Sequence, residues 1–386
     1  MSNPVVPALS WDIFCTVIDN YGDIGVCWRL ARQIAHERGE PVRLWVDDLT
    51  AFSQLEPRLR GHDLPVRLDG VDIAHWQAAH AAPPAKRVVI EAFACDPPAA
   101  FIAAMAQQPL PPVWINLEYL SAEDWVEGCH GLAGRPSGTS LSRHFFFPGF
   151  TARTGGLLRE AALLQESARF AGPARDAWLA QLGLAAPCDH GPLVSLFCYD
   201  NPALPVLLDN WQHGAPLTVL VADGKPRRQL EHWLGQQLIP GKVVMSRQLR
   251  ILTLPFLSQP DYDRLLGSCD LNLVRGEDSF VRAQWAGKPL VWHIYPQADN
   301  AHLDKLAAFA GRYQAELDEA SGNALMQFQQ VWNGAAPGAI GPAWQALMTN
   351  LPALQQHALR WRSQLAALPD LLSQLAQFAV QKMADR

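Results

Sequence analysis

One stretch of the chain concentrates residues that bind phosphate. Arg275-Gly-Glu-Asp-Ser279 directly follows an apolar run, Leu271 to Val274, that predicts a buried strand. A helix is expected to begin near Asp278 or Ser279, and the unpaired N–H groups of its first turn attract anions. Arg275 adds a fork of hydrogen-bond donors at the same point. The stretch predicts the phosphate half of a nucleotide-binding pocket in a transferase.

Two further groups could complete such a site. Asp19 and Asp23 stand four residues apart, among glycines, in a predicted loop after the first strand. Paired carboxylates of this kind can orient a substrate and take a proton. Both groups also have an ordinary structural explanation. Acidic residues at 277 and 278 suit a helix N-terminus, and Asn-x-Gly-Asp is common in turns.

Aromatic side chains follow several strands of the second half. Phe197 and Tyr199 end one predicted strand, and Phe256 follows another. A nucleobase needs a flat apolar surface and a few hydrogen-bonding groups, and Gln259 could read its edge. Tyr295 comes after the next strand and could reach the same ligand. Packing in the core is the alternative explanation for each ring.

Alternating strands and helices position these residues. Such a pattern predicts mostly parallel, doubly wound sheets, whose working residues follow the strand ends. In the first half this places a set of polar residues along one rim: Asp19, Asp23, Asp47, Asp48, Glu91, Asp96, Glu118 and Tyr119. The second series opens at Leu193. The predicted architecture is therefore α/β, with two Rossmann-like domains facing each other across a central cleft and a helical C-terminal segment.

The domain boundaries follow from changes in pattern. Residues 1–156 form the first domain, whose stretch from 121 to 156 is expected to be irregular. Residues 157–190 are a helical crossover, with Gly172-Pro173 dividing it into two short helices. Residues 191–354 form the second domain, and the C-terminal helix, 355–386, is expected to return to the first.

Composition excludes several classes of protein. A net charge of −6 and a pI near 6.0 argue against binding to nucleic acid or to an anionic membrane. The sequence has no apolar run of membrane-spanning length and no signal-peptide pattern, so a cytoplasmic location is expected. The histidines and the seven scattered cysteines match no metal-ligand spacing, and the nicotinamide fingerprint Gly-x-Gly-x-x-Gly is missing.

Long strings of the sequence resemble one family. They include Asp19-Asn-Tyr-Gly-Asp-Ile-Gly-Val-Cys-Trp28, Asn116-Leu-Glu-Tyr-Leu-Ser121, Thr154-Gly-Gly-Leu-Leu-Arg-Glu160, Arg275-Gly-Glu-Asp-Ser-Phe-Val-Arg282 and Gly287-Lys-Pro-Leu-Val-Trp-His293. The chain resembles the bacterial protein-arginine rhamnosyltransferases that modify translation elongation factor P, the EarP family. The similarity spans nearly the whole chain and weakens after about Gly311.

The resemblance implies an inverting, metal-independent glycosyltransferase of the GT-B fold. Its donor would be TDP-β-L-rhamnose, used without a cofactor, and its acceptor an arginine guanidine nitrogen in the N-terminal domain of elongation factor P. This modification would activate the factor for rescue of ribosomes stalled at polyproline. Matching positions imply catalytic roles for Asp23, as general base, Asp19 and Glu277. Those implied to bind the nucleotide are Phe197, Tyr199, Phe256, Gln259, Arg275, Asp278, Ser279 and Tyr295.

Two alternatives stay open. A GT-B glycosyltransferase could use another nucleotide sugar or a small-molecule acceptor. A non-catalytic protein could bind elongation factor P without turnover.

Overall fold

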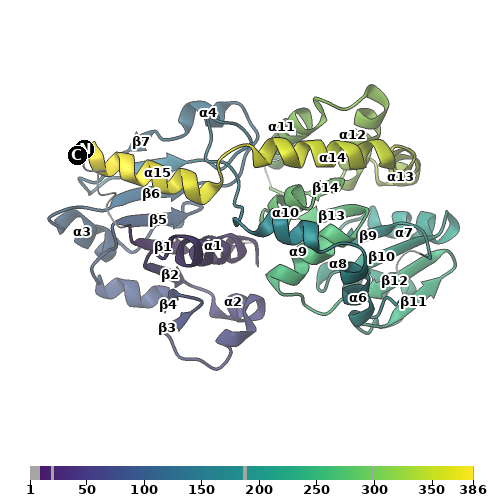
Figure 1. The fold of residues 1–386 in the computed structure, drawn as a ribbon, viewed down its shortest axis with the longest axis horizontal. Coiled ribbons are helices and arrows are strands. Elements are labelled where there is room, and N and C mark those ends of the chain that lie inside the picture. Colours follow the sequence, from purple (N-terminus) through teal and green to yellow (C-terminus); the bar gives the residue numbers. More distant parts are fainter. Residues whose placement is uncertain (1–8, 19–20, 186–188, 298–299, 386) are drawn as a thin grey trace. The chain divides into compact units, whose positions relative to one another are not determined.

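A computed structural model describes residues 9–18, 21–185, 189–297 and 300–385 of the chain (Figure 1). The chain divides into two compact units. Unit 1 comprises residues 1–161 and 365–386, and unit 2 comprises residues 162–364. Among the described residues, no helix is both long and apolar enough to cross a membrane.

Unit 1 is built on an eight-stranded sheet in which most neighbouring strands are parallel. In spatial order its strands are β3 (Val66–Leu68), β4 (Val71–His75), β2 (Val42–Val46), β1 (Trp11–Cys15), β5 (Val88–Ala92), β6 (Val113–Leu117), β8 (Arg143–Phe146) and β7 (Ala133–Gly134). Only the pairs at the two ends, β3 with β4 and β7 with β8, are antiparallel. Because β1 lies between β2 and β5, the chain changes direction across the sheet at β1.

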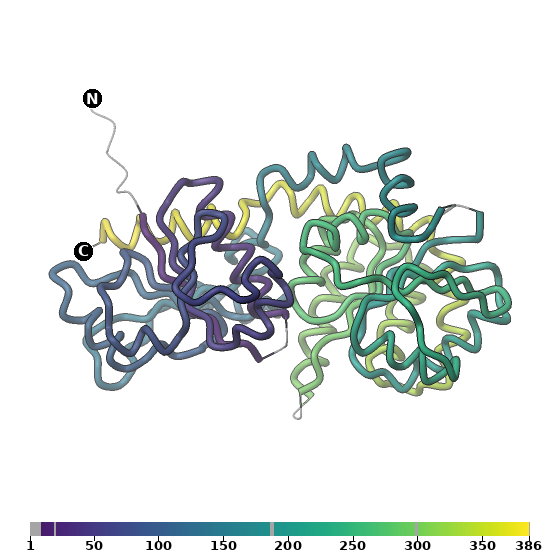
Figure 2. The backbone as a smooth tube through the Cα atoms, turned by 90° about the horizontal axis from the view of Figure 1, so that it is seen from below, coloured from purple at the N-terminus to yellow at the C-terminus, as the bar shows by residue number. Residues whose placement is uncertain are grey.

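Helices cover both faces of this sheet. They are α1 (Gly22–Gln33), continued by the π-helix η1 (Ile34–Arg38), α2 (Leu49–Leu55), η2 (Pro57–Leu59), η3 (Trp76–Ala81), α3 (Ala99–Gln107), α4 (Trp125–Cys129) and α15 (Leu371–Ala384). Apolar residues of α1 and α15 share one core with alternate strand residues. Aromatic residues Phe14, Trp45, Phe101 and Trp114 fill a second core on the opposite face. Figures 1 and 2 both show α15, in yellow, against the purple elements of unit 1.

Unit 2 contains a six-stranded sheet. Its order is β11 (Val243–Ser246), β12 (Leu249–Thr253), β10 (Leu217–Val221), β9 (Leu193–Leu196), β13 (Leu271–Arg275) and β14 (Leu290–His293). Only β11 is antiparallel to its neighbour. The first strand of the unit, β9, again lies in the middle, between β10 and β13.

The helices of unit 2 fall into two series. The first series begins with α5 (Leu163–Arg169) and α6 (Pro173–Gln181), which precede the sheet, and continues with the helices that alternate with its strands: α7 (Leu204–His213), α8 (Lys225–Leu234), α9 (Gln259–Ser268) and α10 (Asp278–Ala286). The helical segment that follows contains α11 (Ala301–Gln314), α12 (Glu319–Trp332), η4 (Pro337–Ala339), α13 (Ile340–Thr349) and α14 (Leu351–Ala366). The α/β class and the helical C-terminal segment predicted from the sequence are confirmed.

Most of the stretch from 121 to 156 is irregular, as expected, but it also contains α4 and two strands, and β8 extends the parallel part of the sheet beside β6. One local expectation was wrong. The turn predicted around Asp23 is instead the first turn of α1, which begins at Gly22. Both Gly22 and Gly25 adopt helical backbone there, and the N–H of Gly25 donates to the carbonyl oxygen of Tyr21 at 2.8 Å.

Candidate active site

The candidate residues fall into two groups, one in each unit, and each group lies where its sheet changes direction. Ligands of open parallel sheets bind at the carboxyl ends of the two strands that flank such a point. In unit 1 those strands are β1 and β5. In unit 2 they are β9 and β13. Phe197 directly follows β9, and Arg275 is the last residue of β13.

Asp23 is the best-defined candidate of unit 1. It is buried in the first turn of α1, where a carboxylate is stabilised by the helix dipole. Its Oδ2 accepts the backbone N–H of Ile18 at 2.8 Å, and its Oδ1 accepts the hydroxyl of Tyr119 at 3.3 Å. These two contacts fix the plane of the carboxylate. Asp19, the second candidate carboxylate, lies outside the described residues.

The other polar residues of the rim have structural partners. Asp47 accepts the N–H of Val17 at 3.0 Å and so joins the ends of β1 and β2. Asp48 caps α2 by accepting the N–H groups of Thr50 and Ala51. These contacts give Asp47 and Asp48 a role in shaping the loops.

Glu91 points to the other face of the sheet. Its carboxylate lies 2.9 Å from the guanidinium of Arg143 and accepts the indole N–H of Trp114 at 2.9 Å. Arg143 also pairs with the exposed Asp96 at 3.2 Å. Burial raises the pKa of Glu91 to about 7, although the Arg143 charge and the Trp114 hydrogen bond both lower it.

The group in unit 2 surrounds Arg275. Its guanidinium lies 4.4 Å from the ring centre of Phe197 and 4.6 Å from that of Tyr199. The Nη1 atom is buried and has no hydrogen-bond partner among the described residues. Tyr295, about half exposed, meets Tyr199 edge-on with ring centres 5.4 Å apart. The predicted grouping of a guanidinium with aromatic rings is therefore present in the fold.

The predicted turn into α10 is also present. Gly276 adopts left-handed backbone (φ 61°), Glu277 is the N-cap residue, and the helix ends at Gly287 as expected. Ser279 lies in the first turn, and its hydroxyl donates to the carbonyl oxygen of Arg275. Asp278, which begins the helix, is half-buried.

Phe256 and Gln259 lie on the neighbouring connection. Phe256, on the loop between β12 and α9, is 41% exposed, so its ring is accessible to a ligand. Gln259 is the first residue of α9 and is buried. The role of these two residues in reading a base stays a prediction.

Sequence reasoning missed Tyr262. Its hydroxyl is buried and has no hydrogen-bond partner among the described residues, and its ring meets Phe197 at 5.9 Å. Burial raises the pKa of this phenol well above its usual range, and the Ser279 side chain lowers the pKa by a smaller amount. The signal was its position: Tyr262 lies three residues after Gln259 and therefore on the same side of α9.

His293 lies beside Arg275 in the sheet, because β13 and β14 pair these two residues in register. Its ring meets Tyr199 at 5.3 Å. Burial, together with the Arg275 charge, lowers the pKa of His293 to about 4, so the ring is neutral near pH 7. His293 thus adds no second positive charge beside Arg275.

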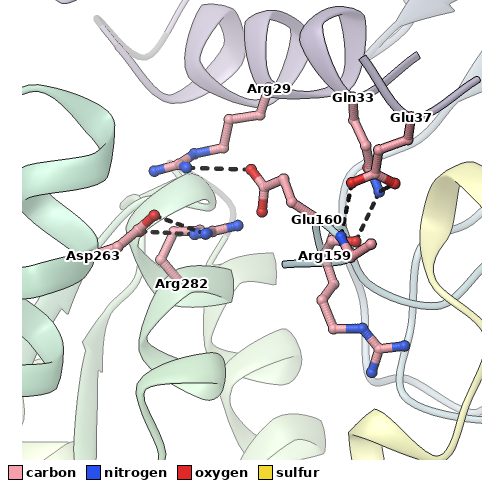
Figure 3. A network of polar contacts seen from close by, with 8 residues as sticks. Arg29, Gln33, Glu37, Arg159, Glu160, Asp263 and Arg282 are labelled. Carbon is pink, nitrogen blue, oxygen red and sulfur yellow. Dashed lines mark hydrogen bonds and ion pairs between the residues drawn. The ribbon is translucent and has the colours of Figure 1, made fainter. Parts of the chain in front are cut away.

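In each unit, the helix that carries the candidate residues, α1 or α10, also has a buried arginine that forms an ion pair, as Figure 3 shows. In unit 1, Arg29 of α1 pairs with Glu160 at 3.5 Å, and Gln33 donates to the carbonyl oxygen of Arg159 at 2.8 Å. In unit 2, Arg282 of α10 makes a two-pronged pair with Asp263 of α9, at 2.8 and 2.7 Å. Bidentate pairs of this kind fix orientation as well as distance.

Two Rossmann-like units, one with a guanidinium between aromatic rings beside a helix N-terminus, are the architecture of GT-B glycosyltransferases. Residues 11–380 match the model of the family described as elongation factor P (EF-P) rhamnosyltransferase EarP. The chain belongs to this family, and it is a glycosyltransferase.

Individual relatives agree with the family assignment. A protein-arginine rhamnosyltransferase of Pseudomonas putida is 50% identical over 376 residues, which cover 96% of this chain and 98% of that protein. One from Pseudomonas aeruginosa is 48% identical over 373 residues, with the same coverage of 96% and 98%. A solved structure, described as the structural basis for EarP-mediated arginine glycosylation of translation elongation factor EF-P, is 38% identical. It matches with a TM-score of 0.69 and covers 96% of this chain and 98% of that chain.

Proposed function

We propose that this chain transfers rhamnose from TDP-β-L-rhamnose, with inversion, to a guanidine nitrogen of one arginine in the N-terminal domain of elongation factor P. The observation that carries the proposal is that Arg275 lies between two aromatic rings, where the sheet of unit 2 changes direction. The chain is also 50% identical to a protein-arginine rhamnosyltransferase. In this proposal the two units have separate roles: unit 2 binds the donor and unit 1 binds the acceptor.

Unit 2 is the proposed donor site. Departure of TDP builds negative charge on the phosphates, and Arg275 and the first turn of α10 would stabilise it. Tyr199, Tyr295 and Phe256 offer rings for the base or the sugar, and Gln259 a polar edge. Glu277, at the N-cap of α10, is assigned to the reaction centre by its match to the family's pattern. We expect the protein to need neither a metal nor a cofactor, since these groups neutralise the leaving group.

Unit 1 is the proposed acceptor site. A guanidinium remains protonated in water, with a pKa above about 12, and its delocalised lone pairs make it a poor nucleophile. A carboxylate can hold it by paired hydrogen bonds and accept a proton as the C–N bond forms. Asp23 is the proposed base, and Asp19 the proposed second carboxylate.

The stereochemistry follows from a single displacement. The arginine nitrogen attacks the anomeric carbon as the bond to TDP breaks, through an oxocarbenium-like transition state. One displacement inverts the configuration, as in inverting glycosidases, in which water takes the place of this nitrogen.

The deciding experiment is the intact mass of elongation factor P after incubation with the chain and TDP-rhamnose. The expected result is a mass increase of one deoxyhexose. Asp23→Asn should abolish transfer while TDP still binds. Asp48→Asn is the matched control on the same sheet, because asparagine caps α2 as well as aspartate does. It should retain turnover.

Other outcomes would identify other functions. A sugar added only from a different nucleotide donor would replace TDP-rhamnose in the proposal. Stable binding of elongation factor P with no mass change would identify a non-catalytic binding protein.

A further inference from the structure

Asp23 is held from the neighbouring strand by an aromatic pair. Tyr119 lies just past β6, and its hydroxyl donates to Oδ1 of Asp23 at 3.3 Å. The ring of Tyr119 stacks on that of Phe93, with centroids 4.4 Å apart and planes within 13°. A phenol that is packed flat on one face can move little, so the stack controls where the hydroxyl points.

Phe93 reaches this position through an unusual backbone. It directly follows β5, and both Phe93 (φ 59°) and Ala94 (φ 55°) adopt left-handed conformation. A residue with a Cβ atom rarely adopts this conformation, because the Cβ atom then lies too close to the following carbonyl oxygen. Two hydrogen bonds to β6 hold it, from the N–H of Phe93 to the carbonyl of Leu117 at 2.7 Å and from the N–H of Ala94 to Asn116 Oδ1 at 3.1 Å.

Strain of this kind persists only where the surroundings enforce it, and it concentrates at functional sites. Here its visible result is that the Phe93 ring lies against Tyr119. Phe93 also belongs to the core of unit 1, so the stack ties the Tyr119 ring to that core.

We infer that Tyr119, held by Phe93, is a positioning residue for Asp23 in the transfer reaction. The inference rests on the proposed function, in which Asp23 is the base. The contacts from Ile18 and Tyr119 hold one carboxylate oxygen of Asp23 each and so fix its plane. A carboxylate whose plane is fixed is oriented for pairing with the two parallel N–H groups of a guanidinium.

The first test is Tyr119→Phe, which retains the stack on Phe93 and removes only the hydroxyl. A hydrogen bond to an ionised group contributes about 1.5–3 kcal/mol, so kcat should fall roughly tenfold to a hundredfold. The KM for TDP-rhamnose should not change. The hydroxyl favours the ionised carboxylate, so its loss should move the acid limb of the kcat/KM profile to higher pH.

Two further variants separate positioning from packing. Phe93→Leu retains an apolar contact without the flat stack and should shift kcat in the same direction by a smaller factor. Tyr313→Phe is the matched control, because Tyr313 is a buried tyrosine of unit 2 whose hydroxyl has no partner among the described residues. It should leave kcat and the pH profile unchanged.

A measurement independent of turnover completes the test. The carboxyl carbon of Asp23 can be followed by NMR in 13C-aspartate-labelled protein and assigned with Asp23→Asn. It should titrate at higher pH in Tyr119→Phe than in the wild type. An unchanged titration overturns the inference, whatever the activity.

The two proposals fail in different ways. If the wild type modifies elongation factor P and Tyr119→Phe does so with the same kcat and pH profile, the positioning role is wrong and the function stands. If the wild type transfers no rhamnose, the proposed function is wrong, and the role of Tyr119 in transfer is overturned with it.

Discussion

Trp292 donates a hydrogen bond of 2.8 Å from its indole Nε1 to the carbonyl oxygen of Gly276. The strand β14 thereby holds the turn between β13 and α10 at its tightest residue, where the backbone is left-handed. The Trp292 ring also lies flat on Phe280 of α10, with centroids 3.9 Å apart. The proposed phosphate turn is therefore fixed from both ends by one side chain.

Trp292→Phe should weaken TDP binding. Phenylalanine can retain the stack on Phe280 but cannot donate to Gly276, whose buried carbonyl then lacks that partner. Such a loss costs about 1–1.5 kcal/mol, so the Kd for TDP, measured by calorimetry, should rise roughly five- to tenfold. Trp211→Phe is the matched control, because the Nε1 of this buried tryptophan has no partner among the described residues. Equal Kd values for both variants would show that the turn does not depend on Trp292.

Tyr262→Phe should weaken the stabilisation of the protein by TDP without lowering the stability of the free protein. The Tyr262 hydroxyl is buried without a partner in the free protein, so removing it should leave the melting temperature unchanged or slightly raised. If the hydroxyl donates to a TDP phosphate, the rise in melting temperature caused by TDP should be smaller in the variant. The same substitution at Tyr313, whose hydroxyl is also buried without a partner among the described residues, should leave the TDP-induced rise unchanged. A full TDP-induced rise in Tyr262→Phe would exclude the hydroxyl from the phosphate site.

Arg275→Lys should weaken TDP binding although the charge is retained. A lysine ammonium cannot pack flat against both Phe197 and Tyr199, and it lacks the planar fork that matches phosphate oxygens. The Kd for TDP should rise on the order of tenfold to a hundredfold. Arg264→Lys is the control, since Arg264 also lies over an aromatic ring, that of Phe170, at 5.6 Å. An unchanged Kd for Arg275→Lys would mean that the charge alone binds the phosphate.

The turn around Arg275 was predictable from the sequence because its signals are local. The apolar run Leu271 to Val274 is followed by Arg275-Gly276. The helix α10 stops at Gly287, which adopts the left-handed conformation that favours glycine. The β3–β4 hairpin, which was not predicted, carries a similar signal. Asp69-Gly70 between two apolar runs has positive φ at both residues, and this pair is typical of a tight hairpin turn.

The environment of Asp23 was not predictable in the same way. Gly22 and Gly25 indicated a turn, yet the packing of α1 against the sheet overrode that local preference. The left-handed backbone at Phe93 and Ala94 has no glycine to announce it, and hydrogen bonds to β6 enforce it. Tyr119 meets Asp23 across 96 residues of sequence. Contacts of that range depend on strand order, which single-sequence patterns do not specify.

Glu91→Gln should remove a pH dependence of stability that the wild type shows. The pKa of Glu91 is about 7 in the folded protein and near 4.5 in an unfolded chain, and burial is the main cause of the difference. Between these values the unfolded chain loses its proton while the folded protein retains it, so stability falls as pH rises. The decline should reach about 3 kcal/mol near pH 7 and stop above it.

Glutamine does not titrate, and its single amide oxygen can accept only one of the two hydrogen bonds that Arg143 and Trp114 donate to Glu91. The difference in unfolding free energy between Glu91→Gln and the wild type, from urea denaturation of the full chain, should therefore grow in favour of the variant from pH 4.5 to 7. Glu319→Gln, at an exposed position in the first turn of α12, should follow the wild type at every pH. A difference that stays constant with pH would show that Glu91 is ionised throughout, with the Arg143 charge outweighing burial.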